Sequence, residues 1–225
     1  IPLPFLFTLA ALALLWREVE ITDPETRNTW LLGFFAMLAF QTALIGLRFS
    51  YGIDKLILIQ PVSGAALSVL GYLAFARPKN PARHLLVFVG LFAVLALAER
   101  WVDIYLAMLN LGYGIALVTL ALRGDPALSW AEINRLPNLR RLLWGIAGLL
   151  ILSGITDAII TLDAWRTEAA NTARLAAIAS TVFAVLVFLG IAAPRLLRPA
   201  DIALLAAMNI AEVPVIRRPR VAILS

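Results

Sequence analysis

The sequence contains no cysteine and one histidine, and it has few charged residues. Of its 225 residues, 15% are charged and 62% are hydrophobic, whereas soluble domains have about 25% charged and about 45–50% apolar residues. The lack of cysteine excludes a disulfide scaffold and a cysteine-ligated metal site. The shortage of charge excludes both an ordinary soluble domain and a disordered chain. We therefore expect lipid to be the main solvent of this chain.

Catalytic motifs are also absent from the sequence. It contains no HExxH motif, no P-loop and no GxGxxG motif. The single histidine, His84, follows Arg83 at the start of an apolar stretch, where we expect a solvated side chain. The two lysines, Lys55 and Lys79, lie outside the last apolar stretch, which excludes a seven-helix retinal pump with its Schiff-base lysine. We expect a protein that is not an enzyme, with no catalytic residue, metal or cofactor.

Seven apolar stretches approach the length that a helix needs to cross a bilayer, about 20 residues. They are Ile1–Trp16, Thr29–Leu47, Leu56–Ala76, Leu85–Ala98, Val102–Leu122, Leu142–Leu162 and Leu175–Ala193. Backbone polar groups must find partners within the segment in lipid, so these stretches should be helices. The sequence thus predicts an all-α membrane protein: a seven-transmembrane helix bundle over residues 1–198 and a cytoplasmic tail over residues 199–225.

The helix count depends on residues 85–122, which contain no glycine or proline between Ala98 and Val102. One helix of this length would extend about 57 Å, far beyond a bilayer core. We therefore favour two helices with a tight turn at Glu99 and Arg100, the first of them short.

The positive charges support seven spans. With seven, fourteen of the 19 lysines and arginines lie on one side of the membrane, whereas six spans place Arg100 within a span and divide the other eighteen eleven against seven. Cytoplasmic loops are enriched in lysine and arginine. This bias places the N-terminus outside and the C-terminus inside. The net charge of +5 then reflects topology rather than a nucleic-acid surface.

Small and aromatic residues have structural interpretations. Gly64, Ser68 and Gly71 in the third stretch, and Gly145 and Gly148 in the sixth, should let helices approach closely. Tryptophans near the expected ends form an aromatic belt: Trp30, Trp101, Trp130, Trp144 and Trp165.

Polar groups within or beside the spans are the candidate ligand-binding residues, because such groups are costly in lipid and often functional. They are Arg48, Gln60, Glu99, Asp103, Asn110 and Asp157. Arg48, Glu99 and Asp103 fall at the outer ends of their spans and should converge on a polar pocket open to the outside. Gln60 lies in the third span, Asn110 in the middle of the fifth, and Asp157 more than one turn inside the sixth. The alternative is that the end charges snorkel or form structural ion pairs, and that Asn110 makes an interhelical hydrogen bond.

Several short segments resemble a known bacterial family. They are residues 48–54 (RFSYGID), 60–62 (QPV), 70–75 (LGYLAF), 111–117 (LGYGIAL), 124–128 (GDPAL) and 153–163 (SGITDAIITLD). Together they make residues 28–193 similar to the membrane module of membrane-bound AraC-type transcription regulators. The resemblance implies a sensor in the bacterial inner membrane whose cytoplasmic C-terminus drives a helix-turn-helix pair. That pair is absent from this sequence, so we expect no direct nucleic-acid binding by this chain.

The last residues, 199–225, are similar to a stretch of molybdopterin molybdenumtransferase. Residues 200–210 should form an amphipathic helix, and residues 221–224 (VAIL) resemble the first buried strand of an α/β domain. The TGDE segment that follows such a strand in that family is absent, so no catalytic residue is carried over. The tail is expected to be the start of a truncated or fused domain, or a basic segment that touches anionic lipid.

These observations favour a sensor or signal-transducing module. Its expected partners are the lipid bilayer, a small-molecule or lipid ligand and a second copy of the chain. Two alternatives remain: a small transporter or channel, and the membrane anchor of a molybdenum-cofactor biosynthesis enzyme.

Overall fold

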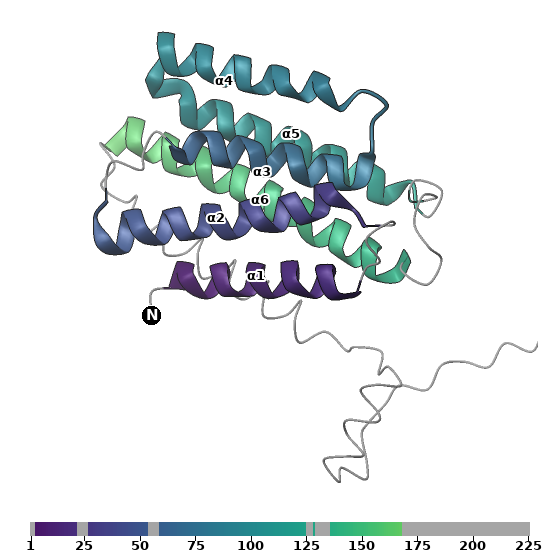
Figure 1. Ribbon diagram of the computed structural model, residues 1–225. Helices are drawn as coiled ribbons and strands as arrows, with labels where there is room; N and C mark the ends of the chain where they lie inside the picture. Colours follow the sequence, from purple (N-terminus) through teal and green to yellow (C-terminus); the bar gives the residue numbers. More distant parts are fainter. Residues whose placement is uncertain (1–2, 22–26, 54–58, 125–127, 129–135, 168–225) are drawn as a thin grey trace, which may run out of the picture. The chain divides into compact units, whose positions relative to one another are not determined.

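A computed structural model describes residues 3–21, 27–53, 59–124, 128 and 136–167. Throughout this part the regular elements are helices (Figure 1), as the sequence predicts. The α-helices are α1 Leu3–Ile21, α2 Thr29–Tyr51, α3 Ile59–Ala76, α4 Leu86–Leu97, α5 Val102–Leu122 and α6 Leu136–Thr167. Two 3₁₀ turns, η2 Pro81–Leu85 and η3 Glu99–Trp101, precede α4 and α5. The seventh expected span and the tail lie outside the described residues.

Four helices in this part are long and apolar enough to cross a membrane. These spans are Thr29–Arg48, Ile59–Ala76, Val102–Leu122 and Leu139–Arg166. Large apolar side chains such as Leu12, Val89 and Leu97 are exposed, as expected where lipid covers the surface. The first expected span is also helical, but α1 continues through Arg17, Glu18 and Glu20 to Ile21.

The break between α4 and α5 confirms two helices in place of one long helix. Ala98 leaves the helical region, with φ −157° and ψ 58°. Its carbonyl oxygen then accepts a hydrogen bond from the Trp101 backbone N–H at 2.8 Å, which closes the turn at η3. The turn contains neither glycine nor proline: one residue outside the helical region, Ala98, separates the end of α4 from η3. The charged residues at this turn favour its position outside hydrocarbon.

The helices pack in a defined order. Helix α1 lies on α2, α2 on α3, α3 on α5 and α5 on α6, whereas α4 lies beside α3 and α5 (Figure 1). The main core contains fully buried side chains from four helices: Leu31 and Phe34 of α2, Phe75 of α3, Leu117 of α5, and Leu143 and Leu150 of α6. A smaller core joins Ala65, Leu91 and Val102 of α3, α4 and α5.

Glycines bring α5 and α6 together, although not those expected from the sequence. A Cβ atom on Gly154 would lie 2.9 Å from the carbonyl oxygen of Ala107, and one on Gly114 would lie 2.7 Å from a side-chain carbon of Ile151. The expectation for Gly71 is confirmed, because its Cβ would lie 3.2 Å from Phe34. For Gly145 and Gly148 no described atom lies within 4 Å of a Cβ; the seventh expected span lies outside the described residues, so this expectation stays a prediction.

Candidate functional site

A polar connection joins three helices inside the described bundle. The Nδ2 group of Asn110, on α5, donates a hydrogen bond to Oδ2 of Asp157, on α6, at 3.1 Å. The hydroxyl of Ser68, on α3, donates to Oδ1 of Asn110. Ser68 is fully buried and Asn110 is 8% exposed. We call Ser68, Asn110 and Asp157 the polar triad.

Close packing of α5 on α6 positions this triad. Asp157 follows Gly154 by almost one turn, and Asn110 follows Ala107 by the same interval, so both polar residues lie beside the closest approach of the two backbones. A larger residue in place of Gly154 would move the helices apart. The amide and the carboxylate would then lose hydrogen-bond distance. The glycine therefore determines whether Asp157 can reach its partner.

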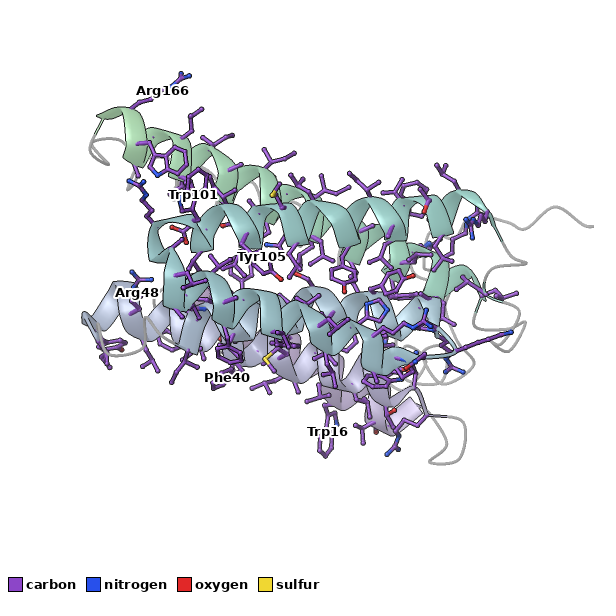
Figure 2. All side chains as sticks on the ribbon, turned by 90° about the horizontal axis from the view of Figure 1, so that it is seen from above. Trp16, Phe40, Arg48, Trp101, Tyr105 and Arg166 are labelled. Carbon is purple, nitrogen blue, oxygen red and sulfur yellow. The ribbon has the colours of Figure 1, made fainter. Side chains whose placement is uncertain are left out.

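A second polar group joins α2 to α3. Nη1 of Arg48 donates to Oε1 of Gln60 at 2.6 Å. Further along the same pair of helices, the Ser63 hydroxyl donates to Oε1 of Gln41. Figure 2 shows Arg48 at the same end of the helices as Trp101 and Arg166, which agrees with the expectation that the outer polar residues share one side.

The remaining candidates lie around the start of α5. Asp103 is exposed in the first turn of α5. Glu99 belongs to η3, and its side chain lies outside the described atoms. The Trp101 and Trp165 rings are 5.1 Å apart, so the start of α5 and the end of α6 meet. Hydrogen bonds thus join four of the six predicted residues in two pairs: Arg48 with Gln60 at one end of the helices, and Asn110 with Asp157 within the spans.

Sequence reasoning missed two parts of this network. Ser68 was expected to serve packing alone, yet its hydroxyl holds the Asn110 amide. His84 is half-buried, and it also makes contacts that were not expected: its Nδ1 lies 2.7 Å from the Tyr113 hydroxyl oxygen, and its ring centroid lies 5.1 Å from that of Tyr72. The repeated Gly-Tyr pairs that contain Tyr72 and Tyr113 were a usable signal, because parallel helices bring such residues to similar depths.

The chemistry available to the polar triad is proton or ligand exchange at a carboxylate. The Asn110 amide donates to the Asp157 carboxylate, and a ligand or a proton that binds this carboxylate would compete with that amide. Among the described residues no group of three or more histidine, cysteine or acidic side chains is placed to hold a metal ion.

Comparison with known proteins adds no family to these observations. No family model, no curated protein and no solved structure matches the chain.

Proposed function

We propose that this chain is the membrane-embedded sensor module of a signal transducer, of the kind found in membrane-bound transcription regulators. The observation that carries this proposal is the polar triad, in which an ionisable group connects α3, α5 and α6. Ionisable residues within membrane spans are costly and mark functional sites. The short sequence resemblances described above support the same interpretation.

The triad provides a physical route from ligand to conformation. A ligand shifts an equilibrium only when it binds the two states differently. A cation or a hydrogen-bond donor that binds the Asp157 carboxylate would break the hydrogen bond between Asp157 and Asn110. The same amide is held by Ser68, so the loss changes the contacts of three helices together. Arg48 and Gln60 would contribute to the outer part of the ligand site.

The proposal includes seven spans, with the N-terminus outside and the C-terminus inside the bacterial inner membrane. Segment Pro81–Leu97 supports this count, because its 3₁₀ turn and α-helix together extend about 28 Å, close to a bilayer core of about 30 Å. Arg27 and Arg77 line one cavity. The ends of two linkers that the charge pattern assigns to the cytoplasm are therefore neighbours.

The test uses the lack of native cysteine. Spin labels are attached to cysteines at Phe40 on α2 and Ile159 on α6, both more than 45% exposed, and their distance distribution is measured in lipid nanodiscs. Asp157→Asn removes the charge and should shift the distribution or the ratio of its populations.

Arg141→Gln, which removes a charge from an exposed position of the same helix, is the control and should leave the distances as in the parent. Circular dichroism checks that helix content is retained in each variant. Equal distributions for the parent and Asp157→Asn would overturn the proposed switch.

A small transporter or channel is the second candidate. It is favoured by the polar contacts that α3 makes at successive levels, through Gln60, Ser63 and Ser68. Proton flux into proteoliposomes that falls with Asp157→Asn and persists with Arg141→Gln would support transport, whereas absence of flux in the parent protein favours the sensor. The membrane-anchor alternative concerns residues 199–225, outside the described part.

A further inference from the structure

The hydrogen bonds of the polar triad form a chain that runs in one direction. The Ser68 hydroxyl donates to Oδ1 of Asn110, and the Nδ2 group of Asn110 donates to Oδ2 of Asp157 at 3.1 Å. The Ser68 hydroxyl oxygen also lies 3.3 Å from the Gly64 carbonyl oxygen, within its own helix. An ionised carboxylate accepts hydrogen bonds and donates none. Every bond of the chain therefore points toward Asp157.

The same chain can run in the opposite direction without movement of a helix. A half-turn of the Asn110 carboxamide about its last side-chain bond exchanges its oxygen and its nitrogen, and the two orientations have nearly the same shape. The oxygen then lies beside Asp157, and the Nδ2 group lies beside Ser68. A hydroxyl both donates and accepts, so Ser68 can accept from the amide and donate to the Gly64 carbonyl oxygen.

The reversed chain requires a proton on Asp157. A carboxylate oxygen and an amide oxygen are both acceptors, so they cannot form a hydrogen bond with each other. One proton from water that binds Oδ2 of Asp157 supplies the missing donor, and this O–H bond is the single covalent change. The N–H···O bond between Asn110 and Asp157 is then replaced by an O–H···O bond. Each member of the triad thus has a hydrogen-bond partner with the proton and without it.

The helices packed on α6 at this level carry little charge of their own. In the described part α6 packs on α5 and α3. Helix α3 contains no charged residue, and the one charged residue of α5 is Asp103, which acts electrostatically on Asp157. The other charged residues of α6 lie toward its two ends: Arg140, Arg141, Asp163 and Arg166. In sequence, the seventh expected span, residues 175–193, has no charged residue either. A proton is therefore a charge that can neutralise Asp157 without a cationic side chain from α3 or α5.

Asp103 provides an approach for this proton. It is exposed in the first turn of α5. It lies seven residues before Asn110, two turns along the same face of the helix. Its carboxylate exchanges protons with water at that end of the helix, and Asp157 itself is half-buried. Protons thus reach the level of the triad along one face of α5.

We propose that the ligand of the polar triad is a proton, and that the Asn110 carboxamide turns over when Asp157 takes up this proton. This inference deepens the proposed sensor function and rests on it for the signalling role. Loss of the charge changes the cost of keeping Asp157 among apolar side chains. The two protonation states therefore favour different packings of α6 on α5.

The carboxamide also distinguishes sensing from transport. A chain of hydroxyl groups or waters passes a proton on, because each oxygen can accept one proton and release another. The Asn110 amide keeps both of its N–H protons in either orientation, so it interrupts such a path. The triad changes its orientation without conducting, which favours proton sensing over proton transport.

The experiment records infrared difference spectra of the whole chain in lipid nanodiscs as the pH falls. An isotope label at the side-chain carbonyl carbon of asparagine separates the carboxamide bands from those of the backbone. In the parent protein a protonated carboxyl band should appear. A carboxamide band should shift to lower frequency with the same midpoint, because a carboxyl group is a stronger donor than the Ser68 hydroxyl. Asp157→Asn should lose both changes.

Three further variants assign these bands. Asn110→Leu should lose the carboxamide shift and keep the carboxyl band. Ser68→Ala should raise the frequency of the carboxamide band at high pH, because Oδ1 of Asn110 then loses its donor. Ser63→Ala is the matched control on α3, since this hydroxyl donates to Gln41 and not to the triad; its spectra should equal those of the parent. Circular dichroism checks the helix content of each variant.

The outcomes separate this inference from the sensor function. A carboxyl band without a carboxamide shift would overturn the reversal, and absence of both would overturn the proton as ligand. The spin-label distances described above are measured over the same pH range. Infrared changes with constant distances would leave the proton site in place and overturn the sensor. Distances that respond to Asp157→Asn without infrared changes would keep the sensor and assign it another ligand.

Discussion

Helices α3 and α4 are neighbours with opposite surroundings. Nine residues of α3 are buried, and its side chains make polar contacts with α2 and α5. In α4 the single buried residue is Leu91, although its sequence, LVFVGLFAVLAL, contains no polar side chain. The more apolar helix is therefore the more exposed one. In a membrane, apolarity brings a helix into lipid, whereas small and polar residues decide whether it enters the bundle.

The contacts that hold α4 are correspondingly few. The Tyr105 hydroxyl donates to the Val87 carbonyl oxygen at 2.7 Å, and Leu91 packs with Ala65 and Val102. The His84–Tyr113 hydrogen bond, at 2.7 Å, holds the 3₁₀ turn that precedes the helix. We expect α4 to move more readily than α3, α5 and α6, which share the close packing and the polar triad.

The largest expected difference in stability is between two glycine-to-alanine variants, one at the contact of α5 with α6 and one in α4. In Gly154→Ala the new Cβ meets backbone, 2.9 Å from the Ala107 carbonyl oxygen, so α5 and α6 must separate. Overpacking of this kind costs about 1–3 kcal/mol. In Gly90→Ala the new Cβ meets the tip of a side chain, 2.7 Å from the Tyr105 hydroxyl oxygen, which can move away.

Unfolding of both variants in mixed micelles measures the contrast. Gly154→Ala should lose clearly more stability than Gly90→Ala. Equal losses would show that α4 is packed as firmly as the inner helices.

The next largest effect concerns the polar triad. Asn110→Ala removes the hydrogen bonds to both Ser68 and Asp157, and interhelical bonds in membranes contribute about 0.6 kcal/mol each, with a maximum of about 1.7. We expect a loss of roughly 1–2 kcal/mol in unfolding free energy. Thr119→Ala is the control, since this exposed hydroxyl donates within its own helix, to the Ala116 carbonyl oxygen at 2.8 Å.

A double-mutant cycle between Ser68→Ala and Asn110→Ala would sharpen this result. A positive coupling energy is expected because the two side chains are hydrogen-bonded. Additive losses would contradict a direct contribution of their bond to stability.

The smallest effect should be local to α4. Tyr105→Phe removes the bond to Val87, a contribution of about 0.5–1.5 kcal/mol. Amide hydrogen exchange in α4 should therefore become roughly 3- to 10-fold faster. Amides of α3 serve as the internal control and should keep their exchange rates. Faster exchange throughout both helices would mean that α4 and α3 unfold as one unit.

Most positions of the described helices could be predicted from the sequence, because the thickness of a bilayer core and the location of charged residues restrict where spans can lie. The fifth span, Val102–Leu122, coincides with α5, and the reversal near Glu99 was expected. The length of helix α6 was underestimated. The expected span began at Leu142, whereas α6 begins at Leu136 and includes Arg140 and Arg141. Charges end a span without ending a helix, because the backbone hydrogen bonds continue in water.

The candidate site was only partly predictable for a related reason. Asp157 was predicted as a candidate because an ionisable residue inside an apolar span can be recognised from the sequence. Its contact with Asn110 depends on the relative rotation and depth of two helices, which Gly154 and Gly114 determine. Among the described residues Gly154 meets α5 closely, whereas Gly145 and Gly148 meet nothing within 4 Å, so a small residue alone does not indicate which helix it contacts. Ser68 remained hidden because a buried serine can bond to its own helix, as its 3.3 Å contact to the Gly64 carbonyl oxygen also shows.

The single-residue joint at Ala98 also bears on how the chain enters a bilayer during synthesis. A helix of 12 residues is shorter than the apolar length that usually inserts independently. Because one non-helical residue separates α4 from the turn before α5, α4 stays close to α5 once α5 has formed. We therefore expect the two to be integrated together as a helical hairpin, with insertion of the earlier helix waiting until the later one has left the ribosome.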